Sequence, residues 1–359
     1  MRIGILGAGQ LGRMLALSGY PLGLSFTFLD PAADACAAPV GEHLRGEYGD
    51  ERALAAFCER CDVATFEFEN VPAAAAAYVA ARRPLMPGAL ALETAQDRLS
   101  EKRLFDRLGI PVPPYEPVDT RDALEAAARR IGYPCVLKTR RLGYDGKGQA
   151  VLRSASDLDA AWSRLGSRAL LLEGFVAFER ELSCIATRGR DGATAFYPVT
   201  ENAHRDGILR TSIPRPDDPL QALAQDYTGR VLAALDYTGV MAFEFFAVGG
   251  GLLANEIAPR VHNSGHWTFD GAACSQFENH LRAVAGLPLG PASLRAPCAM
   301  VNLIGTVPPL QALARIAEAR VHLYGKEPKP GRKLGHVNVV AGNGAARDAA
   351  LARVQALLG

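Results

Sequence analysis

The sequence contains no long hydrophobic run and almost no net charge. No apolar stretch approaches the roughly 20 residues of a membrane-spanning helix, so we expect no membrane insertion. The 39 basic residues balance 38 acidic ones and leave a formal charge of +1. Without a global basic field the protein has no general attraction for nucleic acid or an anionic membrane, and neither is expected as a partner.

Cysteine is sparse, and the N-terminus lacks a sustained apolar segment. The seven cysteines are scattered and odd in number, which is typical of thiols kept reduced in a cytoplasm. Cys58 and Cys61 form a CxxC pair, but no second pair or nearby histidine completes a zinc site, so buried thiols are expected. Gln10 and Arg13 interrupt the apolar start of the chain, unlike a signal peptide. These features predict a cytoplasmic protein.

The length and the local patterns predict two or three domains. The chain has 359 residues, against about 100–200 for a usual domain. Residues 1–96 alternate short apolar strands with helices, which predicts a parallel, doubly wound α/β sheet. Residues 97–288 contain short β runs broken by glycine and Asp-Gly turns, which predict antiparallel sheet. Residues 289–359 predict a small third domain of strands and a closing helix.

The first chemical motif is a glycine-rich turn, Gly7-x-Gly9-x-x-Gly12, between a strand and a helix. Backbone N–H groups at such a helix N-terminus attract an anion. Asp30 ends the next strand, at the acidic position of a dinucleotide fingerprint. On this motif alone, an NAD site and a tight turn that holds a simpler phosphate or nothing are both open.

Lysine is rare, and five of the six lysines fall within 138–147 and 326–333. Lys138 ends a short β run and precedes the loop GYDGKG at 143–148. Three glycines in six residues let this loop fold over a polyphosphate, although it is not a Walker A motif. A glycine-rich surface hairpin is the alternative interpretation.

The strongest hairpin signal is GVMAFEFFAV–GGG–LLANEIAP, with Gly249–Gly251 as the expected turn. Pairing about the middle of that turn places Glu244 opposite Glu256 on one face of two adjacent strands. Opposed like charges destabilise a strand pair, above all among apolar neighbours, so we expect a bridging Mg²⁺. Two exposed glutamates on a solvated face are the alternative. Asn255 is a further oxygen donor that points to the opposite face unless the strand bulges.

Three other polar stretches have candidate roles. The loop Arg260–His266 contains an HxxxH spacing, but its proline and glycine neighbours argue against a helix and hence against zinc, so it suits an oxyanion substrate better. The loop Lys326–Lys333 is either a solvated charge run or a clamp for a substrate phosphate. Glu67 and Glu69 end a strand where parallel sheets bind ligands, and one of them is expected to take ribose hydroxyls.

Seven motifs stand in order along nearly the whole chain: GAGQLGRM, TFEFENVP, DRLSEK, KTRRLGYDGKGQ, DGILRTS, NEIAPRVHNSGHWT and PGRKLGH. Together they resemble the N5-carboxyaminoimidazole ribonucleotide synthetase family of ATP-grasp enzymes. The resemblance implies an N-terminal doubly wound parallel-sheet domain of the biotin-carboxylase-like pre-ATP-grasp kind (1–96). A two-lobed α+β ATP-grasp region (97–288) and a small β-rich C-terminal domain (289–359) would follow.

The resemblance implies ATP-dependent carboxylation of the exocyclic amine of 5-aminoimidazole ribonucleotide by bicarbonate, through carboxyphosphate, in purine biosynthesis. ATP is the implied co-substrate, and Mg²⁺, with Mn²⁺ as an alternative, is the implied metal on Glu244 and Glu256. The implied ATP contacts are Arg98, Lys138, Gly143, Tyr144, Asp145, Gly146, Lys147, Gly148, Gln149, Glu173, Gly174, Phe175, Val176, Glu181, His204, Asn255 and Glu256.

The remaining implied residues surround bicarbonate and the ribonucleotide. Tyr144, Asp145, Arg260 and His262 are the catalytic candidates near bicarbonate and the amine. The implied ribonucleotide contacts are Gln10, Leu11, Glu67, Asn263, Ser264, Lys326, Arg332 and Lys333. The family also implies a homodimer, and we expect the product to pass to a separate carboxylate mutase.

Three other functions are weighed against this one. The first is a sister ATP-grasp ligase, for example a formate-using glycinamide ribonucleotide transformylase, which the run HNSG and the loop GYDGKGQ disfavour. An NAD-dependent dehydrogenase would leave the Glu244–Glu256 pair and the Lys138 loop without a role. A non-enzymatic nucleotide-binding module would bind ATP without turnover.

Overall fold

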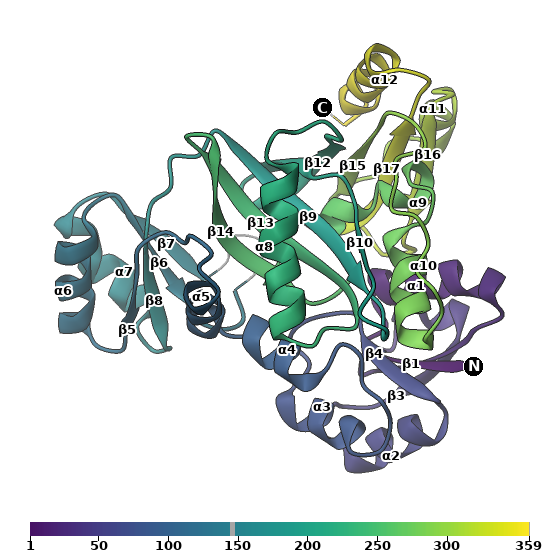
Figure 1. Cartoon of the computed structure of the whole chain (residues 1–359), viewed down its shortest axis with the longest axis horizontal. Coiled ribbons are helices and arrows are strands. Elements are labelled where there is room, and N and C mark those ends of the chain that lie inside the picture. The colour runs from purple at the N-terminus through teal and green to yellow at the C-terminus, as the bar shows by residue number, and fades with distance from the viewer. Residues whose placement is uncertain (144–147, 359) are drawn as a thin grey trace.

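The computed structural model describes residues 1–143 and 148–358, and within these ranges the strands form three sheets (Figure 1). All seven cysteines are unpaired and buried, which confirms the interpretation of Cys58 and Cys61 as buried thiols. Among the described residues, no helix combines the length and apolar character that crossing a membrane requires.

The N-terminal sheet is parallel, in the order β3-β2-β1-β4, as the alternation of strands and helices predicts. Its elements are β1 (Arg2–Leu6), α1 (Gln10–Gly19), β2 (Ser25–Asp30), β3 (Glu42–Arg45), α2 (Glu51–Glu59), β4 (Val63–Phe66), α3 (Ala73–Ala80) and α4 (Ala89–Ala95), with 3₁₀ turns at Tyr20–Leu22 and Ala38–Val40. β1, β2 and β4 are almost wholly buried, because helices cover both faces of the sheet. Their carboxyl ends point toward the rest of the molecule.

A small antiparallel sheet, in the order β5-β8-β6-β7, lies at one end of the molecule (Figure 1). Its elements, preceded by α5 (Arg98–Arg107), are β5 (Tyr115–Val118), α6 (Arg121–Ile131), β6 (Cys135–Thr139), β7 (Gln149–Leu152), a 3₁₀ turn at Ala155–Asp157, α7 (Leu158–Leu165) and β8 (Leu170–Gly174). One face carries the apolar side chains that pack against α6 and α7. By strand alternation Lys138 and Glu173 lie on the other face.

The large sheet has the order β14-β13-β9-β11-β12-β15-β17-β16, with β10 beside β9. Its strands are β9 (Arg180–Arg188), β10 (Thr194–Phe196), β11 (Thr200–Arg205), β12 (Ile208–Pro214), β13 (Gly239–Val248), β14 (Gly251–Ala258), β15 (Cys298–Ile304), β16 (Ala319–Leu323) and β17 (Lys333–Val340). Its helices are α8 (Gln221–Ala234), α9 (Thr268–Gly271), α10 (Gln276–Ala285), α11 (Leu310–Ala314) and α12 (Gly344–Ala356), with a 3₁₀ turn at Asn263–Gly265.

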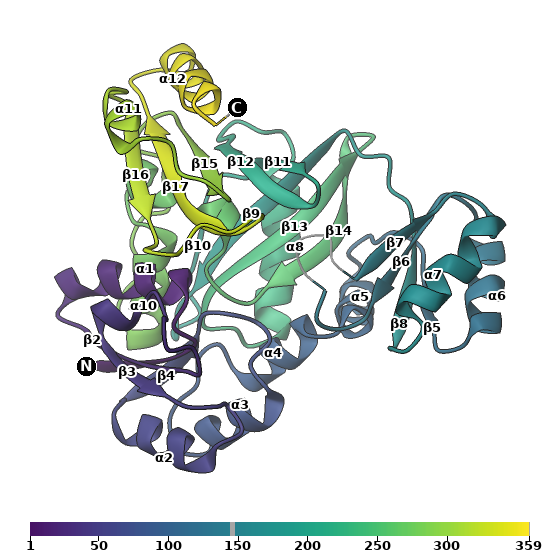
Figure 2. The ribbon, with the colours of Figure 1, turned by 180° about the vertical axis from the view of Figure 1, so that it is seen from behind.

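The C-terminal strands continue the large sheet instead of forming a sheet of their own. Thr211 and Ser212 of β12 pair with Val301 and Met300 of β15. Figure 2 shows β15, β17 and β16 following β12 along one continuous sheet. The expected boundary before residue 289 therefore falls in a segment that connects two parts of one sheet.

Helix α10 joins the N-terminal domain to the large sheet. Phe277 and Leu281 of α10 share one hydrophobic core with Met14 and Leu15 of α1 and with Val240 of β13. Helix α8 packs on the opposite face of β9 and β13 (Figure 1). The N-terminal sheet and the large sheet are thus fixed to each other by buried apolar contacts, and their facing edges enclose a cavity.

Candidate active site

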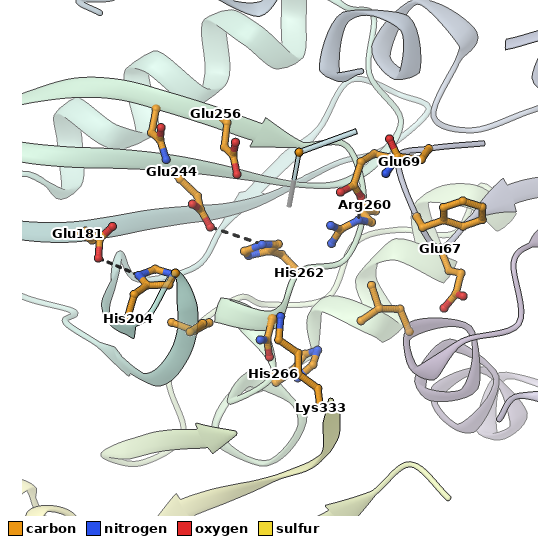
Figure 3. Close-up of a pocket in the computed structure, with 18 of the residues that line it drawn as sticks. Glu67, Glu69, Glu181, His204, Glu244, Glu256, Arg260, His262, His266 and Lys333 are labelled. Carbon is orange, nitrogen blue, oxygen red and sulfur yellow. Dashed lines mark hydrogen bonds and ion pairs between the residues drawn. The ribbon is translucent and has the colours of Figure 1, made fainter. Parts of the chain in front are cut away.

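The main cavity has a volume of about 510 Å³ and lies where the N-terminal domain, the β13–β14 hairpin and β17 meet (Figure 3). Residues far apart in the sequence line it together. Of the residues expected from the sequence, those that line it are Gln10, Leu11, Glu67, Arg98, Gly143, Gln149, Glu181, His204, Glu244, Asn255, Glu256, Arg260, His262, Asn263 and Lys333. The fold therefore gathers expected metal, nucleotide and ribonucleotide residues around one space.

The β13–β14 hairpin places Glu244 opposite Glu256, as predicted, but by a different route. The expected three-glycine turn is wrong: Val248 pairs with Gly251, so the turn has only Gly249 and Gly250 at its tip. A two-residue turn alone would shift the pairing by one residue. A β-bulge at Asn255 restores it, because this residue is left without a partner between Phe245–Ala254 and Glu244–Glu256.

The bulge also settles which way Asn255 points. In a regular strand, successive side chains alternate between the two faces. Here Asn255 and Glu256 both line the cavity, while Ala254 and Ile257 lie in the apolar core behind the hairpin. The extra residue thus puts two oxygen-bearing side chains on the cavity face where a regular strand would put one.

The two opposed carboxylates are electrostatically unequal. Burial, reinforced by the neighbouring Glu256, raises the pKa of Glu244 to about 7. Burial works against ionisation of Glu256 too, but the Arg98 guanidinium, with Nη1 2.6 Å from Oε2, outweighs it and lowers the pKa of that carboxyl. The surroundings thus compensate the charge of Glu256 but not that of Glu244, and a cation bound between the two carboxyl groups would favour ionisation of Glu244.

Two carboxylates alone make a weak metal site. Among residues 1–143 and 148–358, no group of three or more His, Cys, Asp or Glu side chains forms a metal-binding cluster. Mg²⁺ prefers oxygen ligands and commonly combines one or two carboxylates with phosphate oxygens. The Glu244–Glu256 pair fits a Mg²⁺ that arrives with a nucleotide.

Lys138 is held by a buried carboxylate in the small sheet. Glu173 Oε2 accepts a hydrogen bond from Lys138 Nζ at 2.7 Å, and Lys102 Nζ lies 3.7 Å from Oε1. Burial opposes ionisation of Glu173, but Lys138 and Lys102 lower the pKa of its carboxyl to about 2. The carboxylate of Glu173 is thus paired with these two lysines. Gly174 ends β8, and the exposed Phe175 and then Val176 follow it.

Two histidines face the cavity in different states. His204 Nδ1 and Glu181 Oε2 are 2.8 Å apart, and this contact raises the pKa of His204 although burial opposes the charged form. Burial and the nearby Arg260 hold the pKa of His262 well below its usual value. His262 Nε2 lies 3.5 Å from Glu244 Oε1 (Figure 3). Its Nδ1 lies 2.9 Å from the Ser264 hydroxyl. His262 is therefore a neutral imidazole beside the carboxylate pair.

Arg260 is positioned by a residue that the sequence argument left without a specific role. Its guanidinium forms an ion pair with Glu69, and that contact lowers the pKa of Glu69 to about 2 against the effect of burial. Alternation in the strand end FEFEN placed Glu67 and Glu69 on one face, but it could not show that the second glutamate reaches across to Arg260.

The N-terminal glycine turn is occupied by carboxylates of the chain itself. Glu67 accepts hydrogen bonds from the backbone N–H groups of Gly9 and, at 2.7 Å, of Gly12. Asp30 Oδ2 accepts one from the N–H of Ala8 at 3.0 Å. The donors that a dinucleotide phosphate would use are thus already paired, which removes the structural basis of the NAD interpretation.

The basic loop reaches the glycine turn at one point. Lys326 donates a hydrogen bond to Gln10 Oε1, and Lys333, at the start of β17, lines the cavity. The Arg332 guanidinium donates to the carbonyl of Glu327 within its own loop, outside the cavity lining. Asn263 lines the cavity, and its buried side-chain amide has no hydrogen-bond partner in the described part of the chain. Such an amide is suited to a polar ligand.

The other expected residues lie behind the lining or outside the described ranges. Ser264 is buried and accepts a hydrogen bond from Ser183 at 2.8 Å. Gly148 adopts a left-handed conformation just before β7. Tyr144, Asp145, Gly146 and Lys147 lie outside the described residues. Lining residues that the sequence did not single out include Phe246 and Tyr324, and only their proximity in space reveals them.

Three family models match successive parts of the chain. The Ribonucleotide synthetase preATP-grasp domain matches residues 1–96 and the ATP-grasp domain matches residues 103–277. The Phosphoribosylaminoimidazole carboxylase C-terminal domain matches residues 298–350.

Whole-chain relatives include N5-carboxyaminoimidazole ribonucleotide synthases from several organisms. The chain is 56% identical to the N5-carboxyaminoimidazole ribonucleotide synthase of Pseudomonas aeruginosa over 358 residues, which covers 100% of this chain and 99% of that one. It is 54% identical to the solved N5-carboxyaminoimidazole ribonucleotide synthetase of Thermus thermophilus, with a TM-score of 0.95 over 99% of this chain and 98% of the other. A structure from Aspergillus clavatus, in complex with ADP and 5-aminoimidazole ribonucleotide, is 32% identical, with a TM-score of 0.92 over 99% and 98% of the two chains.

Proposed function

The chain belongs to the N5-carboxyaminoimidazole ribonucleotide synthase family of ATP-grasp ligases, and from that premise we propose how its cavity performs the ATP-dependent carboxylation of 5-aminoimidazole ribonucleotide. The observation that carries the assignment of residues is the opposed Glu244–Glu256 pair in a cavity that also holds Arg98, Arg260 and Lys333. Two opposed carboxyl groups at one end and basic groups around them suit a metal–nucleotide complex and anionic co-substrates.

ATP and its metal occupy the hairpin end of the cavity. Glu244 and Glu256 would hold Mg²⁺, which when bound would supply positive charge to neutralise the phosphates. Lys138, which is paired with Glu173, and Arg98 face the phosphates. His204, whose pKa is raised by its contact with Glu181, supplies a further hydrogen-bonding group for the nucleotide. The small sheet and the hairpin enclose the nucleotide from two sides.

Bicarbonate and the ribonucleotide occupy the other end. Arg260, oriented by Glu69, faces the bicarbonate anion, and the neutral His262 is able to accept a proton as the amine reacts. Asn263 contributes its amide, which has no partner within residues 1–143 and 148–358, while Lys326 and Lys333 attract the ribonucleotide phosphate. Glu67 retains acceptor capacity for ribose hydroxyls, because two N–H groups do not saturate a carboxylate.

The reaction then balances in two steps. A bicarbonate oxygen attacks the γ-phosphorus of ATP, the bond to the β-phosphate oxygen breaks, and ADP leaves. The amine of the ribonucleotide attacks the carbon of the resulting carboxyphosphate, phosphate leaves, and the amine loses a proton. The main contribution of the protein is to position the reactants and to stabilise transferring charge.

The test is phosphate release from ATP with Mg²⁺ and bicarbonate, with and without 5-aminoimidazole ribonucleotide. We expect release to require the ribonucleotide and to match the loss of its free amine. Release with glycinamide ribonucleotide and formate instead would assign the cavity to the sister ligase. ATP binding without release in either mixture would contradict an enzymatic role.

We also propose a homodimer and transfer of the product to a separate carboxylate mutase, both from the family resemblance. Sedimentation equilibrium of the full chain measures the first. A coupled assay, in which a mutase consumes the product, measures the second.

A further inference from the structure

The bulge at Asn255 is held by a fully buried lysine. Lys102 on α5 is 1% exposed, and its Nζ donates hydrogen bonds to the carbonyls of Ala254 at 3.1 Å and Asn255 at 3.0 Å. In a regular strand two successive carbonyls point in opposite directions. One ammonium group that binds both therefore selects the bulged conformation over the regular one.

Two further contacts from the same region fix the residues on either side of the bulge. Glu101, also buried, accepts a hydrogen bond from the N–H of Ile257 at 2.9 Å. The carbonyl of Pro111, in the loop after α5, accepts one from the N–H of Ala254 at 2.8 Å. β14 lies at the end of the large sheet, so these groups satisfy its outer edge where no further strand does.

We propose that Lys102 is a positioning residue that holds the Asn255 bulge and thereby the pairing of Glu244 with Glu256. If the bulge relaxed into regular pairing, the two-residue turn would place Asn255 opposite Glu244 and turn Glu256 toward the apolar core. The metal pair would then lose one carboxylate. Lys102 touches neither carboxylate in the structure and acts through the backbone.

The same lysine links the bulge to the small sheet. Its Nζ lies 3.7 Å from Glu173, the carboxylate that orients Lys138. Burying an ammonium group is costly unless it is paired and hydrogen-bonded. Two carbonyls and one carboxylate meet that requirement, so the register of the hairpin and the position of Lys138 depend on one cation.

The first experiment compares the full-length chain with Lys102→Met, which keeps the side-chain length and removes the three donors. Without metal, hydrogen exchange at residues 254–257 should become faster in the variant than elsewhere in β14. With ADP present, the Kd for Mn²⁺, followed by electron paramagnetic resonance, should rise about tenfold or more, as for other residues that orient metal ligands. Val231→Ala, a buried change on α8, is the control for general destabilisation and should leave the Mn²⁺ affinity unchanged.

The second experiment removes the need for the bulge. Deleting Asn255 converts the hairpin to regular pairing with Glu256 still opposite Glu244, so in this background Lys102→Met should change the Kd for Mn²⁺ by less than twofold. An equal loss in both backgrounds would overturn the proposal and assign Lys102 to Glu173 instead. If Lys102→Met alone fails to fold, the doubly changed chain should fold, and its failure would overturn the proposal as well.

The inference rests on the proposed metal role of the carboxylate pair. Different measurements would contradict the role of Lys102 and the role of the pair. Faster exchange at 254–257 with unchanged Mn²⁺ affinity would overturn the link between register and metal. Absence of Mn²⁺ binding by the unchanged chain with ADP would overturn the proposed function. The exchange measurement would still test whether Lys102 holds the Asn255 bulge.

Discussion

The glycine turn before α1 and the β13–β14 hairpin both contain glycines and both border the cavity with a glutamate side chain, yet the charges of these glutamates are stabilised differently. At the turn, Glu67 accepts two backbone N–H groups, so the anion site is filled from within. At the hairpin, Glu244 and Glu256 oppose each other and Arg98 pairs with only one of them. The difference shows that a glycine motif predicts a ligand only where its polar groups lack partners in the chain.

The largest expected effect comes from removing charge at the hairpin. Glu244→Gln should lower turnover by roughly 100-fold or more, because a metal ligand is lost. Without metal, the same change should leave the free energy of unfolding unchanged or raise it, since it relieves like-charge repulsion. Phosphate release and urea unfolding in EDTA measure the two quantities.

Glu256→Gln is the companion to that experiment, because it also removes the partner of Arg98. It should abolish activity with a retained fold but without the gain in stability. Activity of either variant at ordinary Mg²⁺ would contradict the bridging-metal argument.

The opposite result is expected at the glycine turn. Glu67→Gln replaces an acceptor of two N–H groups by a side chain with one acceptor and a misplaced NH₂ donor, so it should destabilise the fold by about 2–3 kcal/mol. Urea unfolding measures it, with the exposed Glu42→Gln as the matched control. A loss of stability as small as in the control would mean that the turn does not depend on its internal anion.

His280 of α10 joins β4 of the N-terminal sheet to β13 of the hairpin, which should make this contact sensitive to pH. His280 Nδ1 accepts from the N–H of Val240 at 3.1 Å, and its Nε2 lies 2.9 Å from the Thr65 hydroxyl. Burial lowers the pKa of His280 to about 4. A histidine that is buried neutral contributes its full stability above the unfolded pKa and loses it as pH falls toward the folded one.

We therefore expect a loss of about 2 kcal/mol in unfolding free energy at pH 5 relative to pH 7 from this residue, starting from an unfolded pKa of about 6.5. His280→Asn should flatten that part of the profile. Equal slopes for the two proteins between pH 6.5 and 5 would show that another group controls the acid response.

The smallest effect is expected at the basic loop. Lys326→Ala should raise the KM for the ribonucleotide about tenfold, equivalent to about 1.4 kcal/mol, and change the KM for ATP less. Lys329→Ala, an exposed lysine in the same loop, serves as the control. Equal effects of Lys326→Ala on both constants would place this loop nearer the nucleotide.

Much of the fold was predictable because its signals are local. Alternating strands and helices predicted the parallel sheet of residues 1–96, and the glycine run predicted the β13–β14 hairpin. The opposition of Glu244 and Glu256 was predicted from a three-residue turn, whereas the structure reaches it through a two-residue turn and a bulge. The bulge was not predictable, because it depends on Lys102, which lies 152 residues before Ala254 in the sequence. The pairing of Glu69 with Arg260 is equally non-local.

The sequence also could not show which part of the molecule helix α10 packs against. Its residues lie within the expected ATP-grasp range, yet its apolar side chains complete the core of the N-terminal domain. An amphipathic pattern shows that a helix has a face to bury, but it does not name the partner. The boundaries 1–96, 97–288 and 289–359 therefore remain predictions about folding units.

The unbroken sheet from β14 to β16 has a consequence for how this chain can be divided. Cutting after residue 297 would strip β15 from β12 and leave the N–H and C=O groups of Thr211 and Ser212 facing water along an open edge. Open edges invite pairing with other chains. A shortened protein of this kind would tend to self-associate. The last 62 residues therefore cover a sheet edge that would otherwise favour aggregation, and they also contribute to the cavity lining.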